Sequence, residues 1–285
     1  MQKVAGTTDL PALQGVHPLP PSAPEAFARD GHVLVEALAT REEVEAYRPR
    51  IAAATDAYAW DKRPLEERDT YGRAFLQAAQ LWRRSPDIAG FSLSPRFARV
   101  AASLLGVDGV RLYHDQALFK EAGGGHTPWH QDQVYWPLDT DRTVTMWMPL
   151  ADVIAPVRGM TFASGTHRMG DLSGLAISDA SEDSLAALVE DKALACHTYE
   201  TVRAGDATFH AGWTLHSAGP NPTDRVRPVM TVIYMADGMR AVEPANEQQG
   251  FDLRLWLAPT RPGELIQGDR NPLLWRRSWT AAGSG

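Results

Sequence analysis

Short apolar runs separated by turn residues fill the second half of the chain and constrain its fold more than any other feature. Four of them, rich in β-branched and aromatic residues, span Val110–Lys120, Thr143–Val153, Glu200–Phe209 and Pro228–Ala236. Runs of this length bounded by Gly, Pro, Asn or Asp predict strands. Because only Glu182–Lys192 between them predicts a helix, we expect a mainly β protein with an antiparallel sandwich or barrel core.

The first hundred residues carry helix signals instead. Ser22–Glu25 and Thr40–Glu43 both fit a capping box, in which a hydroxyl and a carboxylate satisfy the first backbone N–H groups of a helix. Pro49 is expected to interrupt or kink the second of these helices. A third helix is expected over Ser94–Leu105, opened by Ser-Pro and closed by a glycine. The run His32–Glu36 predicts a short strand between the first two.

These patterns divide the 285 residues into four parts. We expect an irregular leader (1–20), a mostly helical layer (21–106), a β core (107–240) and a C-terminal segment (241–285), all in one domain. The leader lacks the apolar centre of a signal peptide, and no window approaches 18 consecutive apolar residues. A cytoplasmic protein without a membrane span is therefore expected.

Composition narrows the classes of partner. With 28 Lys and Arg against 35 Asp and Glu, the formal net charge is −7, which disfavours nucleic acid and anionic membranes as partners. The single cysteine, Cys196, excludes an intramolecular disulfide or a cysteine-rich metal site, and we expect it to be buried and inert. Tryptophan is unusually frequent, with nine residues against eight Phe and seven Tyr. Seven of them lie from residue 129 onward, four in the expected β core and three in the C-terminal segment: Trp129, Trp136, Trp147, Trp213, Trp256, Trp275 and Trp279.

The motif with the clearest chemistry is Trp129-His130-Gln131-Asp132. On a strand, residues i and i+2 project to the same face, so His130 and Asp132 can point at one atom while Gln131 faces away. An imidazole and a carboxylate together suit a divalent metal ion. His216, between a strand and a turn, is the best third ligand. Two His and one carboxylate form the facial triad of non-haem iron(II) oxygenases.

A positively charged residue follows the predicted metal ligands and could bind a co-substrate. Arg227 lies eleven residues after His216 on a predicted strand, and its planar guanidinium can bind a carboxylate through two hydrogen bonds. A dicarboxylate could chelate iron at one end and pair with Arg227 at the other. Arg225 is the competing anchor, but it is nearer a turn and expected to be solvated. His210 is expected to pack or line the pocket rather than bind the metal.

Taken together, these residues resemble the phytanoyl-CoA dioxygenase family of iron(II)- and 2-oxoglutarate-dependent oxygenases. The resemblance covers about Pro24 to Met239. Besides the residues above, it rests on the following phrases: Phe27-Ala-Arg-Asp-Gly31-His-Val-Leu-Val, Trp147-Met-Pro-Leu150, Ser164-Gly-Thr-His167-Arg168, Gly205-Asp206 and His216-Ser-Ala-Gly-Pro-Asn221. It implies a double-stranded β-helix (jelly-roll, cupin-like) core.

The resemblance also implies roles for individual residues. His130, Asp132 and His216 would bind Fe(II), and Arg227 would hold the distal carboxylate of 2-oxoglutarate, with O2 as the second co-substrate. Lys120 lies ten residues before His130, where relatives place a polar residue that contacts 2-oxoglutarate. Gln116 on the same strand face is the alternative, and Trp136 is expected to line the iron and co-substrate pocket.

Two departures and one match refine this reading. Relatives often carry Glu-Asn-Gly after the Pro-Leu strand, where this chain has Ala155-Pro-Val-Arg158-Gly159-Met160. They also often have a hydroxyl residue two positions after the distal histidine, where Ala218 stands here, so other donors such as Lys120 gain importance. Halogenases of this superfamily replace the metal carboxylate by Gly or Ala, so Asp132 favours hydroxylation or another oxidation.

The predicted activity is oxidation, most simply hydroxylation, of a small or medium organic metabolite, with release of succinate and CO2. The alternative is a cupin-like metal-dependent isomerase or small-molecule binder, which would need no Arg227. The sequence leaves the substrate, the position oxidised and the oligomeric state open. We expect the substrate pocket to be lined by the N-terminal helices, the 133–142 loop and Phe251–Trp279.

Overall fold

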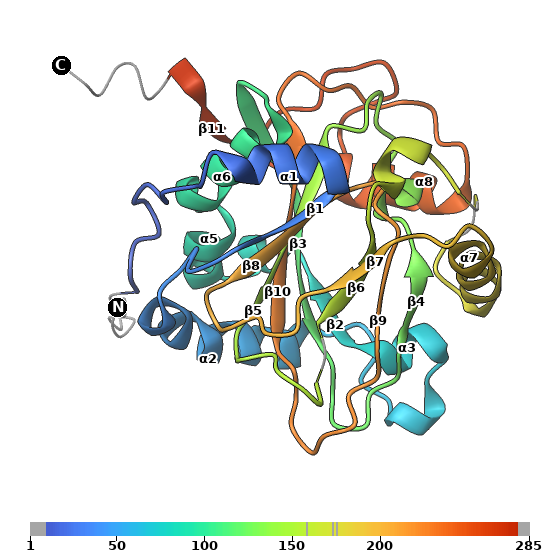
Figure 1. The fold of residues 1–285 in the computed structure, drawn as a ribbon. Helices are drawn as coiled ribbons and strands as arrows, with labels where there is room; N and C mark the ends of the chain where they lie inside the picture. The colour runs from blue at the N-terminus through green and yellow to red at the C-terminus, as the bar shows by residue number, and fades with distance from the viewer. Residues whose placement is uncertain (1–9, 158, 173, 175, 279–285) are drawn as a thin grey trace.

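Helices cover one face of a β-sandwich in the computed structural model, which describes residues 10–157, 159–172, 174 and 176–278 (Figure 1). The helices before the core are α1 (Ser22–Asp30), α2 (Arg41–Tyr58), η1 (Leu65–Glu67), α3 (Thr70–Ala74), α4 (Leu81–Arg84), α5 (Pro86–Ser92) and α6 (Pro95–Leu105). Those within and after it are η2 (Asp132–Tyr135), η3 (Thr166–Met169), α7 (Asp179–Asp191), α8 (Glu247–Asp252) and the π-helical turn η4 (Leu253–Leu257). No helix among the described residues is long and apolar enough to cross a membrane.

Two sheets form the sandwich, and every pair between named strands is antiparallel. The larger sheet has the order β1-β8-β5-β10-β3-β11, with β2 also on β3, and the smaller has the order β4-β9-β6-β7. The strands of the larger sheet are β1 (His32–Val35), β2 (Leu76–Ala79), β3 (Gly109–Phe119), β5 (Thr143–Pro149), β8 (Ala207–Ala211), β10 (Val229–Ala236) and β11 (Leu273–Arg276). Those of the smaller sheet are β4 (Thr127–His130), β6 (Met160–Ala163), β7 (Cys196–Thr198) and β9 (His216–Ala218).

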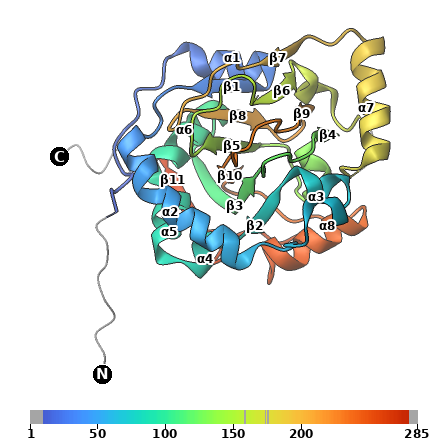
Figure 2. The ribbon, with the colours of Figure 1, turned by 90° about the horizontal axis from the view of Figure 1, so that it is seen from below.

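This architecture confirms the predicted mainly β fold with flanking helices and a jelly-roll core. Figure 2 shows α2, α4 and α5 on one side of the larger sheet and α7 at the opposite side of the molecule, beside β4. Three strands of the larger sheet, β1, β2 and β11, come from outside the expected core range 107–240. The sheet therefore draws the N-terminal layer and the C-terminal segment into the sandwich.

Some local predictions were right. Thr40 caps α2 and Glu43 completes the capping box. Ser94 caps α6, and Gly106 ends it with φ of +64°, a left-handed conformation that glycine adopts without strain. The first capping box was wrong, because Pro21 is the N-cap of α1 and no side chain caps it. The interruption at Pro49 was also wrong: α2 continues through it, and buried Tyr47 and Ile51 on either side hold the helix to the core.

Other features differ from the prediction because of contacts with neighbouring strands. The expected strand 200–209 begins only at Ala207, because Val202 forms an isolated bridge to Val153 and the chain then turns at Gly205. Cys196 was predicted to be buried but is exposed, because β7 is the edge strand of the smaller sheet and only one neighbour covers it. Trp279 and Arg158 lie outside the described residues.

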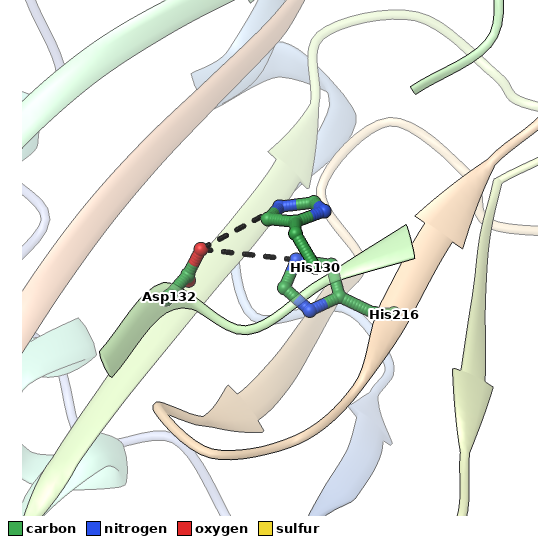
Figure 3. A group of neighbouring side chains, drawn as sticks. All are labelled: His130, Asp132 and His216. Atoms are coloured by element: carbon green, nitrogen blue, oxygen red, sulfur yellow. Dashed lines mark ion pairs between the residues drawn. The ribbon is translucent and has the colours of Figure 1, made fainter. Parts of the chain in front are cut away.

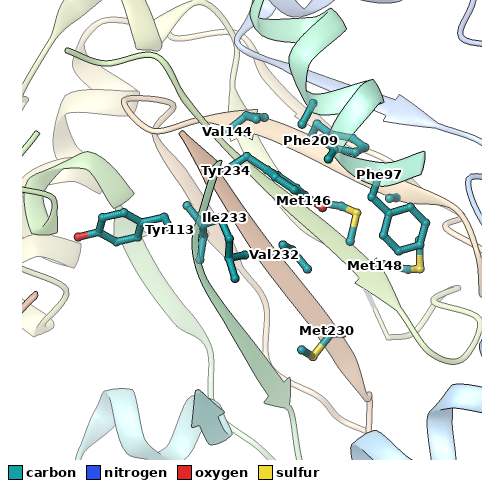
Figure 4. Close-up of a cluster of buried hydrophobic side chains, with 14 of the residues drawn as sticks. Phe97, Tyr113, Val144, Met146, Met148, Phe209, Met230, Val232, Ile233 and Tyr234 are labelled. Carbon is teal, nitrogen blue, oxygen red and sulfur yellow. The ribbon is translucent and has the colours of Figure 1, made fainter. Parts of the chain in front are cut away.

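The helical layer is attached through apolar side chains on the outer face of the larger sheet. In Figure 4, Phe97 of α6 faces Met146, Met148 and Phe209 from β5 and β8. Phe97 is fully buried and makes an edge contact with Phe91 of α5, with ring centroids 5.3 Å apart. The outer face of the sheet is therefore closed by α6, and the inner face is left for the space between the two sheets.

We predict that Phe97→Ala lowers the free energy of unfolding by about 3–5 kcal/mol, because it leaves a ring-sized cavity under α6. Urea denaturation followed by circular dichroism measures this change. The matched control is Ser103→Ala, which alters an exposed residue of the same helix and should change the stability by less than about 0.5 kcal/mol. A loss for Phe97→Ala no larger than that of the control would contradict this packing.

Candidate metal centre

Three side chains at one end of the strand pair β4–β9 converge on one point (Figure 3). His130 ends β4, Asp132 begins η2, and His216 begins β9, directly opposite His130 in the register. One ligand atom of each residue lies within 4.8 Å of the other two. Asp132 Oδ1 is 3.7 Å from His130 Nε2 and 3.9 Å from His216 Nε2. A single ion between these atoms would contact all three.

The hydrogen bonds of the two histidines fix which nitrogen faces the cluster. His130 Nδ1 lies 2.8 Å from the Pro128 carbonyl, and His216 Nδ1 lies 2.9 Å from the Thr214 carbonyl. Because a carbonyl only accepts, both Nδ1 atoms carry the proton and both Nε2 lone pairs face Asp132. Burial lowers the pKa of both histidines, which keeps them neutral. Neutral imidazoles in this tautomer are ready metal ligands.

Asp132 is oriented through its second oxygen. Its Oδ2 accepts hydrogen bonds from Thr145 Oγ1 at 2.9 Å and from His210 Nε2 at 3.1 Å, which leaves Oδ1 toward His130 and His216. Burial alone would raise the pKa of Asp132, but the hydrogen bond that His210 donates holds it well below its ordinary value. The carboxylate is therefore ionised and fixed in direction.

Gln131 faces away from the cluster, as the alternation predicted. Its amide donates to the carbonyls of Gly170 and Trp213 and accepts from Leu172 N–H. The strand itself ends at His130, so Asp132 belongs to a 3-10 turn and not to the strand expected for both residues. The extended backbone of Gln131 (φ −125°, ψ 127°) still turns its two neighbours to the same side.

A cavity of about 320 Å³ opens beside the three residues, between the two sheets. Arg227 lines it, is 4 % exposed, and places its guanidinium carbon 5.3 Å from the ring centroid of Trp147. Burial lowers the pKa of Arg227 only to about 10, so the side chain is charged at neutral pH. Trp147 lies two residues along β5 from Thr145, which holds Asp132. Two residues of extended strand correspond to roughly 7 Å along β5. Arg227, beside Trp147, therefore lies further along the cavity wall than Asp132, beside Thr145.

The two other candidates for co-substrate contacts differ in position. Gln116 lines the cavity and accepts a hydrogen bond from Gln77 at 2.6 Å. Lys120 lies behind the wall, where its ammonium donates to the Gly125 carbonyl and to Thr127 Oγ1. Burial and the nearby Arg227 lower the pKa of Lys120 to about 6.

The structure also locates three other residues named in the sequence analysis, Arg225, Ala218 and Trp136. Arg225 is solvated as expected, with a side chain 90 % exposed. Ala218 faces the cavity, and the hydroxyl missing there is present directly across the strand pair at Thr127, which lines the same cavity. Trp136 lines the cavity and packs against Tyr113 at 5.4 Å between ring centroids.

Several lining residues carried no usable sequence signal. Thr145 was detectable only as a hydroxyl residue on the predicted strand Thr143–Val153. Tyr71 and Asp252 belong to helices remote in the sequence, and nothing in their local pattern points to a cavity. The N-terminal layer, the 133–142 loop and the segment from Phe251 all contribute to the lining of this cavity: Trp60, Tyr71, Phe75, Gln77, Tyr135, Trp136, Phe251, Asp252 and Trp256.

The donor set fits a non-haem iron(II) ion, because two neutral imidazoles and one carboxylate on one side leave other coordination positions open. The sequence matches the model of the family described as "Phytanoyl-CoA dioxygenase (PhyH)" over residues 27–229. The chain therefore belongs to this family. A search of curated protein sequences gave no match.

Solved structures share the fold over most of the chain. SnoN, a non-heme α-ketoglutarate-dependent epimerase from nogalamycin biosynthesis, is 26% identical with a TM-score of 0.72, over 89% of this chain and 97% of SnoN. SnoK, a carbocyclase from the same biosynthesis, is 25% identical with a TM-score of 0.74, over 91% and 99%. EctD from S. alaskensis, solved with 2-oxoglutarate and 5-hydroxyectoine, is 21% identical with a TM-score of 0.64, over 92% and 93%, and shows likeness of fold alone.

The family and the cluster define the class of enzyme. The protein is a non-haem iron(II)- and 2-oxoglutarate-dependent dioxygenase, with Fe(II) as cofactor and 2-oxoglutarate and O2 as co-substrates. The alternative of a non-oxidative cupin-like isomerase or binder is thereby set aside.

We predict that His210→Phe weakens Fe(II) binding by about 10- to 100-fold, because the aspartate loses a hydrogen bond that orients it. His210→Gln keeps an N–H donor and should recover part of the affinity. Equilibrium dialysis of Fe(II) under anaerobic conditions measures the change, and His126→Asn, at an exposed histidine, is the control. Equal affinities for the wild type and His210→Phe would remove His210 from this role.

Proposed function

We propose that this enzyme oxidises a small or medium organic metabolite at an iron centre held by His130, Asp132 and His216, with Arg227 binding the distal carboxylate of 2-oxoglutarate. The observation that carries the proposal is a single cavity containing both the three-residue cluster and a charged, buried guanidinium. When bound, the iron supplies the oxidising chemistry, coupled to conversion of 2-oxoglutarate to succinate and CO2.

The chain's own residues bind and orient. The three ligands occupy one side of the metal, and Thr145 and His210 hold Asp132 in place. A short dicarboxylate bound to the metal beside Thr145 would extend along the cavity wall toward Arg227, beside Trp147. Such an anion also offsets the unfavourable burial of the guanidinium. Trp136 and Trp147 add rigid apolar walls that exclude water from the reacting centre.

Lys120 and Gln116 have separate parts in this proposal. Gln116 faces the cavity and can contact the co-substrate directly. Lys120 supports Thr127, and its lowered pKa leaves it mostly neutral at pH 7 beside Arg227. A bound dicarboxylate would favour the protonated form of Lys120, so that its positive charge increases as the co-substrate enters.

Hydroxylation is the simplest outcome that the proposal allows. SnoN is an epimerase and SnoK a carbocyclase, and both depend on α-ketoglutarate. Epimerisation or ring closure is therefore the second candidate. A coenzyme A thioester is disfavoured, since Arg227 is the only Lys or Arg among the described residues that line the cavity. We further propose one cytoplasmic oxygenase domain over residues 1–285.

We predict that His130→Ala and Asp132→Ala each abolish substrate-dependent succinate formation, because two ligands hold iron too weakly and leave it misplaced. Anaerobic addition of Fe(II) and 2-oxoglutarate should give a weak visible charge-transfer band in the wild type and none in either variant. His126→Asn, at an exposed histidine, should retain both. Full turnover in Asp132→Ala would refute the ligand assignment.

We predict that Arg227→Ala raises the 2-oxoglutarate concentration required for half-maximal turnover by about 10- to 100-fold, the loss expected for a buried charge-assisted pair. The exposed Arg225→Ala should leave this requirement unchanged. Titration of succinate formation against 2-oxoglutarate separates the two variants. An unchanged requirement in Arg227→Ala would move the anchor to another residue.

A further inference from the structure

The cavity continues past the metal cluster into a second region lined by aromatic rings and one carboxylate. Trp60, His114, Phe251, Asp252 and Trp256 line this region. Trp256 lies near three of these rings, with centroid distances of 4.7 Å to His114 and 6.4 Å to Trp60 and Phe251. Trp60 is 54 % exposed and marks the opening to solvent. We call this region the aromatic chamber.

Asp252 is the carboxylate of the aromatic chamber. It is 5 % exposed, and its Oδ2 accepts a hydrogen bond from Tyr113 Oη at 2.8 Å. Trp256 also donates to it. Both partners are neutral, and within the described part of the chain no Lys, Arg or His forms an ion pair with Asp252. Burial consequently raises the pKa of Asp252 to about 7.

A β-bulge in the pairing of β3 with β10 places the Tyr113 hydroxyl beside Asp252. The pairing of β3 with β10 shifts between Ile233 and Tyr234, so that Tyr113 has no partner in the register. A bulge redirects side chains, and Figure 4 shows the Tyr113 hydroxyl pointing away from the other labelled side chains. Tyr113 contacts Trp136 on one side and holds Asp252 on the other. The carboxylate is therefore a positioned part of the cavity wall.

The charges of the cavity lie at opposite ends. Arg227 forms a backbone bridge with Lys120, just after the end of β3, whereas the ring of His114 in β3 contacts Trp256 of the aromatic chamber. Six residues of extended strand separate Lys120 from His114, which is roughly 20 Å of backbone. The positive end suits the dicarboxylate co-substrate. The negative end has no counterpart in the iron or 2-oxoglutarate sites proposed above.

We propose that the aromatic chamber binds a cationic group of the substrate, a protonated amine or another organic cation, between the Asp252 carboxylate and the ring of Trp256. This inference rests on the proposed function, since it names the substrate class of the same cavity. A buried carboxylate gains most from a charged partner, and indole faces attract organic cations. The cation fixes one end of the substrate and so presents another part of it to the metal.

The test compares two probes of similar size, benzylammonium and benzyl alcohol, at about pH 8, where Asp252 is ionised. Calorimetric titration of full-length protein loaded anaerobically with Fe(II) and 2-oxoglutarate measures both affinities. We expect the wild type to bind benzylammonium at least about tenfold more tightly than benzyl alcohol. Asp252→Asn keeps the size and the acceptor for Tyr113 but loses the charge, so the two probes should bind about equally.

Two further variants complete the design. Glu247→Gln removes an exposed charge from the same helix and should keep the wild-type preference. Trp256→Phe keeps a ring and the Asp252 charge, so it should retain a reduced preference, and it still tests the idea if Asp252→Asn does not fold. Equal binding of the two probes by the wild type, or an undiminished preference in Asp252→Asn, overturns the proposal.

Failure of this inference is distinguishable from failure of the proposed function. Wild-type protein is first examined for the charge-transfer band with Fe(II) and 2-oxoglutarate. A band without a preference for benzylammonium rejects only the cation site. No band rejects the proposed iron and co-substrate site, whatever the probes do.

Discussion

The inner space of this protein is organised around one half-buried carboxylate, that of Asp132. Asp132 lies among three imidazoles, and its ionised form is stabilised because His210 and Thr145 donate hydrogen bonds to one oxygen. The Nε2 atoms of His130 and His216 face the other oxygen. Without a cation, this arrangement brings the lone pairs of two nitrogens and a carboxylate oxygen together, which is unfavourable. A divalent ion reverses the sign of that interaction. The pairing of β4 with β9 supports the cluster, because it sets His130 opposite His216.

The sandwich separates a structural face from a chemical face. On β5, Met146 and Met148 point toward α6, while Thr145 and Trp147 point into the cavity. The same alternation on β10 places Thr231 in the cavity wall and Val232 in the core. Each central strand therefore contributes to stability and to the site at once. Mutations one residue apart should consequently affect different properties.

Charge is distributed along the cavity in a way that fits two different ligands. The Arg227 guanidinium occupies one end, with Lys120 behind the wall, and Asp252 with aromatic rings occupies the other. The metal cluster lines the same cavity. Such polarity allows a dicarboxylate and a cation to enter one cavity in defined orientations without competing for the same place.

The sequence by itself determined the features that depend on neighbours in the chain. Alternation predicted β3 and β10 and the shared direction of His130 and Asp132, and the Thr40 capping box predicted the start of α2. The sequence could not determine features that depend on contacts between distant segments. The continuation of α2 through Pro49, the exposure of Cys196 on an edge strand and the bulge at Tyr113 all arise from packing. For the same reason, only the tertiary structure placed Gln116 rather than Lys120 on the cavity wall, and only it placed the carboxylate of Asp252, 120 residues after Asp132, in the cavity beside the metal cluster.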